Sequence, residues 1–141
     1  MSVLIEKSLD TLIELRGRDL EARQADLAGK QVVCARIEAN IERLHALMDG
    51  VSTAQAPSLA ENTAAYKTSL LELAEGQRRE LEQRRQHVEQ AREAVLDAAR
   101  RKQVLEQLLQ QSRARAQFAR QRQQQKQQDE LATQMWSRRP A

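Results

Sequence analysis

The sequence has very few aromatic residues, with one Trp, one Tyr and one Phe among 141 residues. Because 30% of the residues are charged, too little bulky apolar material remains for the broad core of a globular domain. Only four Gly and two Pro are present, and no alternating run of β-branched residues indicates a β-sheet. The chain instead favours Ala, Leu, Glu, Gln and Arg, the residues typical of long helices and coiled coils. We therefore expect an elongated, all-α protein.

Cysteine, long apolar runs and a leader pattern are also scarce or missing. The single cysteine, Cys34, excludes an internal disulfide, and its place in an apolar row favours a small buried hydrophobe. No apolar run approaches the roughly 18 residues that a membrane span requires. The first ten residues contain acid and base too early for a signal peptide. We expect a cytoplasmic protein.

The sequence also lacks the patterns of a catalytic or metal site. His45 and His87 fall on different predicted helices, without Cys or acidic residues at metal-ligand spacing. The four glycines are scattered singly, so they form no phosphate-binding loop. A pair of helices offers no concave pocket for acid–base catalysis. We expect no catalytic residue, no metal and no cofactor, and hence no enzyme.

What the sequence does contain is heptad spacing over two long segments. The first segment, 2–48, has an apolar residue at every seventh position: Ile13, Leu20, Leu27, Cys34, Ile41 and Met48. Its companion row begins basic and becomes apolar: Leu9, Arg16, Arg23, Lys30, Ile37, Leu44 and Val51. This pattern predicts a helix that packs tightly on a partner helix near residue 48 and less tightly near the N-terminus.

The second segment, 58–136, has a similar row of residues at alternating steps of three and four. The row is Leu59, Thr63, Tyr66, Leu70, Leu73, Gln77, Leu81, Arg84, Val88, Ala91, Val95, Ala98, Lys102, Leu105, Leu109, Ser112, Ala116 and Ala119. One irregularity falls at Leu73, Gln77 and Leu81, where two steps of four follow each other. We expect a coiled-coil helix with a local stutter there.

The connection between the two segments, 49–57, contains the strongest break in the chain. Gly50 can end a helix, Pro57 cannot lie in a helix interior, and Ser58 with Glu61 forms a capping box. A connection of about nine residues joins antiparallel neighbours. We therefore predict one coiled-coil domain over 1–141, an antiparallel helical hairpin. The first helix would cover the second to about residue 105, leaving an overhang over about 105–136.

Positive charge is concentrated toward the predicted overhang. Residues 100–128 contain eight Lys or Arg and only Glu106 as an acid, a net charge of +7, whereas residues 1–99 carry thirteen bases and seventeen acids, a net charge of −4. This basic stretch could be a solvated face, bind an acidic protein or bind nucleic acid. A basic leucine zipper places its bases before the zipper, which is the reverse of the order here.

Three stretches of this sequence resemble the flagellar export protein FliJ and its type III secretion counterparts. The first is Leu9-x-x-Leu12-x-x-Leu15-Arg16 with Glu21-Ala22-Arg23 and Leu27. The second is Arg100-Arg101-Lys102-Gln103-Val104-Leu105-Glu106-Gln107-Leu108, and the third is Lys126-Gln127-Gln128-Asp129-Glu130-Leu131-Ala132. The third stretch is the most specific, because it is close to the terminal signature of the family.

The resemblance implies an antiparallel coiled coil similar to the central stalk of rotary ATPases. It implies a non-catalytic protein that couples the hexameric export ATPase (FliI-like) to the export gate and escorts export chaperones, at the cytoplasmic face of the inner membrane. The open end of the hairpin would contact the ATPase ring through these residues: Arg16, Arg23, Leu131, Met135, Trp136 and Arg138. An exposed Trp is typical of such a contact, although a frayed tail that contains a Trp is the alternative.

The resemblance also implies a second contact, with the cytoplasmic domain of the export gate (FlhA-like). The matching positions are Leu44, Leu47, Tyr66, Leu70, Leu73 and Gln77. The sequence departs from the family here, because two aromatic positions on the first helix are Leu47 and Val51. For Leu44, Leu70 and Leu73, packing between the two helices is the alternative role. Two other functions stay open, a homodimeric coiled-coil scaffold and a basic coiled coil that binds nucleic acid.

Overall fold

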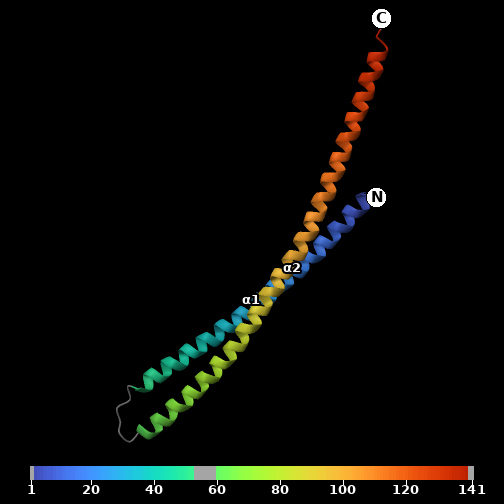
Figure 1. The fold of residues 1–141 in the computed structure, drawn as a ribbon. Helices are drawn as coiled ribbons and strands as arrows, with labels where there is room; N and C mark the ends of the chain where they lie inside the picture. Colours follow the sequence, from blue (N-terminus) through green and yellow to red (C-terminus); the bar gives the residue numbers. More distant parts are fainter. Residues whose placement is uncertain (1, 53–59, 140–141) are drawn as a thin grey trace. The chain divides into compact units, whose positions relative to one another are not determined.

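The structure, a computed structural model, describes residues 2–52 and 60–139 and consists of two long helices. Helix α1 spans Ser2–Ser52 and helix α2 spans Ala60–Ser137 (Figure 1). Within these described ranges there is no strand, and the two helices pack against each other. The predicted all-α class and helical hairpin are therefore confirmed.

The first helix ends later than the sequence indicated. α1 continues through Gly50 to Ser52, and among the described residues no glycine has a positive φ. Gly50 is therefore not a left-handed helix cap. The helix extends because Met48 is buried and Val51 is half-buried, and burial of such side chains offsets the roughly 1 kcal/mol cost of a helical glycine. Pro57 and Ser58, the predicted helix breaker and N-cap, lie outside the described residues.

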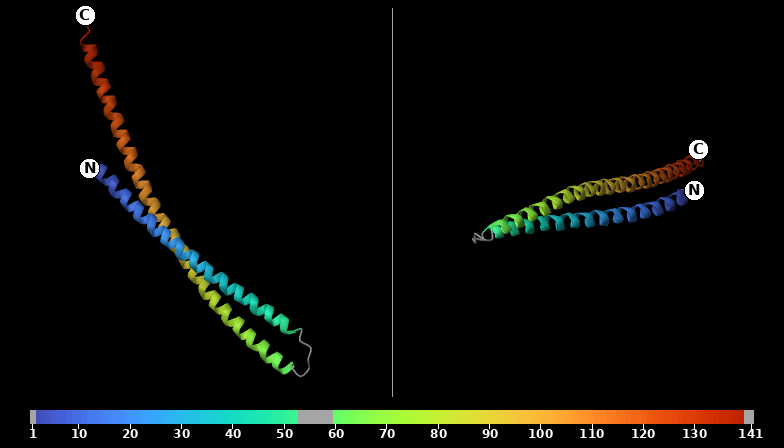
Figure 2. Two further views of the ribbon diagram at one scale, coloured as in Figure 1. Left: turned by 180° about the vertical axis from the view of Figure 1, so that it is seen from behind. Right: turned by 90° about the horizontal axis from the view of Figure 1, so that it is seen from below.

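Contacts between Cα atoms divide the chain into two compact units. Unit 1 comprises the described residues of 1–19 and 99–141, and unit 2 comprises residues 20–98. In each unit a segment of α1 runs alongside a segment of α2 in the opposite direction (Figures 1 and 2).

Unit 2 contains the main hydrophobic cluster. Cys34, Ile37, Leu81 and Val88 are 6–8% exposed and lie between the helices, with Leu27, Val33 and Ile41 packed against them. Complete burial of a Val, Leu or Ile side chain contributes about 1.5–3 kcal/mol. The prediction that Cys34 is a small buried hydrophobe is confirmed.

The row of α1 residues that faces α2, here called the α1 seam, is the predicted one. Its six apolar members from Ile13 to Met48 are all buried or half-buried. In the companion row Ile37 is 6% exposed, whereas Arg23 is exposed. Nine of the ten buried hydrophobic residues in the described chain belong to unit 2, and Leu109 alone belongs to unit 1. The expected change from tight to more polar pairing toward the N-terminus is confirmed.

The corresponding α2 seam differs from the predicted row in its first part. Ala74 is 1% exposed and Lys67 is half-buried, whereas Leu73 is 57% and Tyr66 is 47% exposed. The α2 seam therefore contains Lys67 and Ala74 instead of Tyr66 and Leu73. With this change, steps of four and three residues alternate without interruption from Thr63 to Ala116, so the predicted stutter is wrong. The larger residues Tyr66 and Leu73 suggested a shifted row, but a small Ala fits where the two backbones come close.

The register of the two helices also places the end of the paired region. Asp10 and Arg113 pair in unit 1 at 3.9 Å, and Glu38 and Arg85 pair in unit 2 at 3.3 Å; in each pair the two residue numbers add up to 123. This register places Val51 opposite about residue 72, not at the beginning of α2. The N-terminal part of α1 consequently covers α2 to about residue 120, and the expected limit of 105 was too early.

Candidate functional site

The part of α2 beyond the paired region is a candidate binding surface. Every described side chain from Gln117 to Arg139 is exposed, and Figure 1 shows this part of unit 1 continuing as a single helix past the N-terminus of α1. We call α2 residues 121–137 the uncovered segment. Its Gln-rich sequence was expected to be helical, and the structure confirms this.

Three large apolar side chains are exposed near the end of the uncovered segment. Leu131 is 59%, Met135 is 73% and Trp136 is 71% exposed. Leu131 and Met135 lie one helical turn apart on one face. The guanidinium carbon of Arg139 lies 5.4 Å from the centre of the Trp136 ring, within the range of a cation–π contact. This end therefore combines apolar area with positive charge.

The two other predicted ATPase contacts lie elsewhere. Arg16 is half-buried in unit 1. A Cβ atom added to the neighbouring Gly17 would lie 3.9 Å from the side chain of Lys102. From Lys102 to Leu131 is about 44 Å along α2 at 1.5 Å per residue, so Arg16 is not part of the Leu131 cluster. Arg23 is exposed and belongs to unit 2. The structure brings together only the predicted residues near the end of α2: Leu131, Met135, Trp136 and Arg138.

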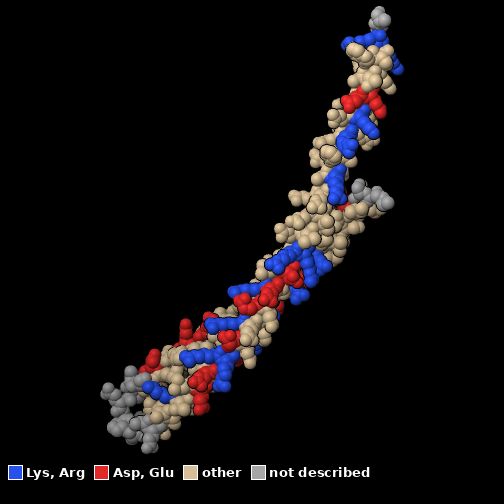
Figure 3. All heavy atoms as spheres, in the orientation of Figure 1, with Lys and Arg blue, Asp and Glu red and all other residues tan. Residues whose placement is uncertain are grey.

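The basic stretch of residues 100–128 is partly used inside unit 1. The Lys102 amino group lies 3.6 Å from Glu106, and Arg113 faces Asp10. Of the eight bases in this stretch, only Arg122 and Lys126 fall in the uncovered segment. On the face shown in Figure 3, the helices of unit 1 carry a broad uncharged area bordered by Lys and Arg side chains.

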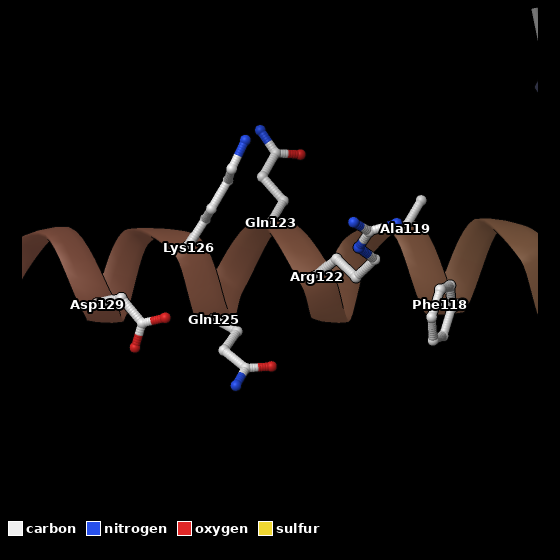
Figure 4. Close-up of a pocket in the computed structure, with 7 residues that line it drawn as sticks. All are labelled: Phe118, Ala119, Arg122, Gln123, Gln125, Lys126 and Asp129. Carbon is white, nitrogen blue, oxygen red and sulfur yellow. The ribbon is translucent and has the colours of Figure 1, made fainter.

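A shallow hollow on α2 has no opposing wall. It is lined by Phe118, Ala119, Arg122, Gln123, Gln125, Lys126 and Asp129. Figure 4 shows that all seven side chains project from one helix, with Lys126 and Gln123 on one side and Asp129 and Gln125 on the other. The Arg122 guanidinium lies 5.9 Å from the centre of the Phe118 ring. This surface lacks the enclosure that a small-molecule site needs.

Unit 2 has a second candidate surface, near the end of the hairpin. Leu47, Tyr66 and Leu73 are 47–57% exposed, and each immediately precedes a seam residue. A residue before a seam position is rotated by about 100° from the seam, and in antiparallel helices such residues lie on the same side of the pair. We call Leu47, Tyr66 and Leu73 the tip patch.

The other predicted export-gate residues pack between the helices. Leu70 is 5% exposed, and Leu44 and Gln77 are half-buried. These positions match the alternative role of helix packing, most clearly for Leu70. Sequence reasoning missed Leu71, which is 50% exposed but follows a seam residue and therefore lies on the opposite side from the tip patch. The signal for Leu71 was present, since it is a large apolar residue outside the heptad row.

The part of the chain that the structure describes contains no cluster of metal-binding side chains. Among residues 2–52 and 60–139, no three His, Cys, Asp or Glu residues come together as metal ligands. His45 is half-buried and accepts a hydrogen bond of 2.8 Å from Arg78, since a guanidinium can only donate.

None of the helical stretches in the described chain is long and apolar enough to span a membrane.

These features define the class of the protein as a two-helix coiled coil. A model of the flagellar FliJ protein family matches residues 6–141, nearly the whole chain, and the chain therefore belongs to this family. The resemblance seen in the sequence is confirmed. The family consists of non-catalytic export components, so the chain has a role related to flagellar export. No curated protein and no solved structure gives a significant match.

Proposed function

We propose that this chain is the stalk of the flagellar export ATPase complex, linking a hexameric ATPase ring (FliI-like) to the cytoplasmic domain of the export gate (FlhA-like). The proposal is supported by two exposed apolar surfaces of different composition. The uncovered segment carries Leu131, Met135 and Trp136 beside basic residues, and the tip patch carries Leu47, Tyr66 and Leu73. A coupling protein needs two such separate contacts.

The ATPase contact is the part of the proposal that the uncovered segment supports. An exposed Trp with a neighbouring Arg is a frequent centre of binding energy in protein interfaces. The chain would work in the cytoplasm at the inner face of the membrane, where the export apparatus holds it, and would also escort export chaperones. Arg16 and Arg23 would contribute separately from the Leu131 cluster, since unit 1 does not bring Arg16 near that cluster.

Co-elution with the cognate ATPase and measurement of ATP turnover test the stalk role. The wild-type chain should promote ring assembly and turnover, and the double variant Leu131→Ala, Trp136→Ala should reduce the affinity at least tenfold, because truncating a central aromatic anchor costs about 2 kcal/mol or more. Leu96→Ala is the matched control, since Leu96 is 55% exposed in unit 2. An intact chain that changes neither assembly nor turnover would exclude the stalk role.

The tip patch is tested with the isolated cytoplasmic domain of the gate. Leu73→Ala and Tyr66→Ala should weaken binding to this domain, while Leu71→Ala, on the opposite side of the helix pair, should not. Equal losses for Leu71 and Leu73 would show that this side of the hairpin is not the contact.

The two alternative functions give different results in solution. A homodimeric scaffold would sediment as a stable dimer or larger assembly, whereas a stalk would be mainly a monomer. A nucleic-acid-binding coiled coil would bind duplex DNA with an affinity that falls steeply with salt. Absence of DNA binding at a salt concentration of about 50 mM would exclude it.

A further inference from the structure

One side of unit 1 carries exposed apolar residues from both helices. Ile5, Leu12 and Leu15 of α1 and Val104 and Leu108 of α2 all immediately precede positions of the heptad seam. By helix geometry they therefore share one side of the antiparallel pair. Each is between 44% and 54% exposed. We call these five residues the apolar flank.

A groove lies between the two helices at one end of the apolar flank, where Ile5 and Leu108 of the flank line it. It is lined mainly by apolar atoms, with Ile5 and Leu9 on one wall and Leu108, Ala116 and Ala119 on the other. The small Ala side chains leave the groove open between the larger Ile and Leu residues. Two rows of residues at helical spacing with a gap between them form the surface into which a further helix packs.

Positive charge borders this groove. Arg115 and Arg120 line it together with uncharged Gln111 and Ser112. Neither arginine forms an ion pair with any residue that the structure describes. A helix lying in the groove would therefore place its border residues beside two cationic side chains, and carboxylates would be favoured there.

The opposite side of unit 1 has a different character. There Arg113 faces Asp10 at 3.9 Å, and the groove is lined chiefly by Gln103, Glu106 and Gln110. This side pairs its own charges, and six of the eight residues that line its groove are polar, the exceptions being Ile13 and Leu109. The apolar flank is thus a distinctive feature of one side and not a general consequence of two helices with few large residues.

We propose that the apolar flank of unit 1 binds an amphipathic α-helix of another protein, whose apolar stripe is bordered by Glu or Asp. A second copy of this chain is the less favourable occupant, because its own flank supplies Arg115 and Arg120 instead of carboxylates. The site is separate from the Leu131 cluster, since Leu108 and Leu131 are about 35 Å apart along α2. It is therefore independent of the part of the proposed ATPase contact that the Leu131 cluster forms, although Leu15 of the flank is next to Arg16.

Binding of designed helical peptides to the full chain tests this site without any other protein. The probe is a labelled peptide of about 18 residues, roughly 27 Å as a helix, with Leu at helical spacing and Glu on both borders. Comparison peptides carry Lys in place of Glu, or the same residues in scrambled order. Fluorescence anisotropy should show that the Glu peptide binds at least tenfold more tightly than either comparison peptide.

Substitutions in the groove locate the bound peptide. Leu108→Glu and Arg115→Glu should each weaken binding of the Glu peptide at least tenfold, and Leu96→Glu, at a comparably exposed leucine in unit 2, should change it less than twofold. Circular dichroism and sedimentation check that each variant stays folded. The proposal is overturned if the Glu peptide binds no more tightly than the scrambled peptide, or if both groove variants bind it as the wild type does. It is also overturned if the chain self-associates and Leu108→Glu abolishes this, since a second copy then occupies the groove.

Discussion

The α2 seam through Ala74 predicts an unusual order of mutational effects among four neighbouring residues. Leu70 is 5% and Ala74 is 1% exposed, whereas Leu73 is 57% and Leu71 is 50% exposed. Leu70→Ala removes buried methyl groups and should lower the free energy of unfolding by about 2–4 kcal/mol. Leu73→Ala removes mostly solvated atoms and should cost less than about 1 kcal/mol, with Ala slightly the better helix former.

The substitution Ala74→Leu supplies the opposite test at the same turn. The register places Ala74 opposite Met48, which is 9% exposed, so a larger side chain has little free space. Overpacking of this kind costs about 1–3 kcal/mol. A seam through Leu73 would instead leave position 74 at the border, where Leu would be tolerated or even stabilising.

Urea unfolding followed by far-ultraviolet circular dichroism measures these differences. Leu71→Ala is the matched control for Leu73→Ala, because both leucines are half-exposed on α2 on opposite sides of the seam. The expected order of cost is Leu70→Ala first, Ala74→Leu second, and the two surface variants last. If Leu73→Ala costs as much as Leu70→Ala while Ala74→Leu is neutral, the stuttered seam is correct and the observed register is not.

Three further predictions concern the ends and the surface of the helix pair. Deleting residues 121–141 should leave the free energy of unfolding unchanged within about 0.5 kcal/mol. Deleting residues 106–141 should destabilise the chain, because this deletion removes buried Leu109; if the overhang began at residue 105, the same deletion would have no effect on stability. Glu38→Gln should cost at most about 1 kcal/mol in the same urea assay, because Glu38 and Arg85 are more than half exposed. Cys34 is 8% exposed, so in the folded chain its thiol should react with a thiol reagent much more slowly than in the urea-unfolded chain. Equal reaction rates in the two states would contradict the burial of Cys34.

The sequence was sufficient for the fold class because the heptad signal extends over both helices. The α1 seam from Ile13 to Met48 was correctly predicted, since every member is apolar and the row keeps a strict seven-residue spacing. The α2 seam was wrong at Tyr66 and Leu73. Beside Leu73 the buried residue is the small Ala74, and beside Tyr66 the residue in the seam is the half-buried Lys67. Hydrophobicity alone favours the larger residue, whereas the space between two helices favours the smaller one.

The candidate surfaces were only partly predictable for a related reason. Leu131, Met135 and Trp136 lie beyond both the expected limit near residue 105 and the observed limit near residue 120, so their exposure followed from the overhang alone. What the sequence lacked was the register of the helices, and counting from the connection misplaced the end of the paired region by about fifteen residues. The apolar flank of unit 1 was also missed. Leu12 and Leu15 were noticed as part of a family pattern, but their position beside Leu108 depends on which α2 residue faces each α1 residue.

The register also decides which charges are available to a partner at the end of α2. The net charge of +7 over residues 100–128 suggested an interaction dominated by electrostatics. In the structure Arg113 faces Asp10 and Lys102 lies near Glu106, so the uncovered segment retains Arg122 and Lys126 among glutamines. Charges on a single exposed helix are screened over about 8–10 Å in physiological salt. A partner at this end would therefore gain most of its affinity from Leu131, Met135 and Trp136, with the bases chiefly accelerating encounter.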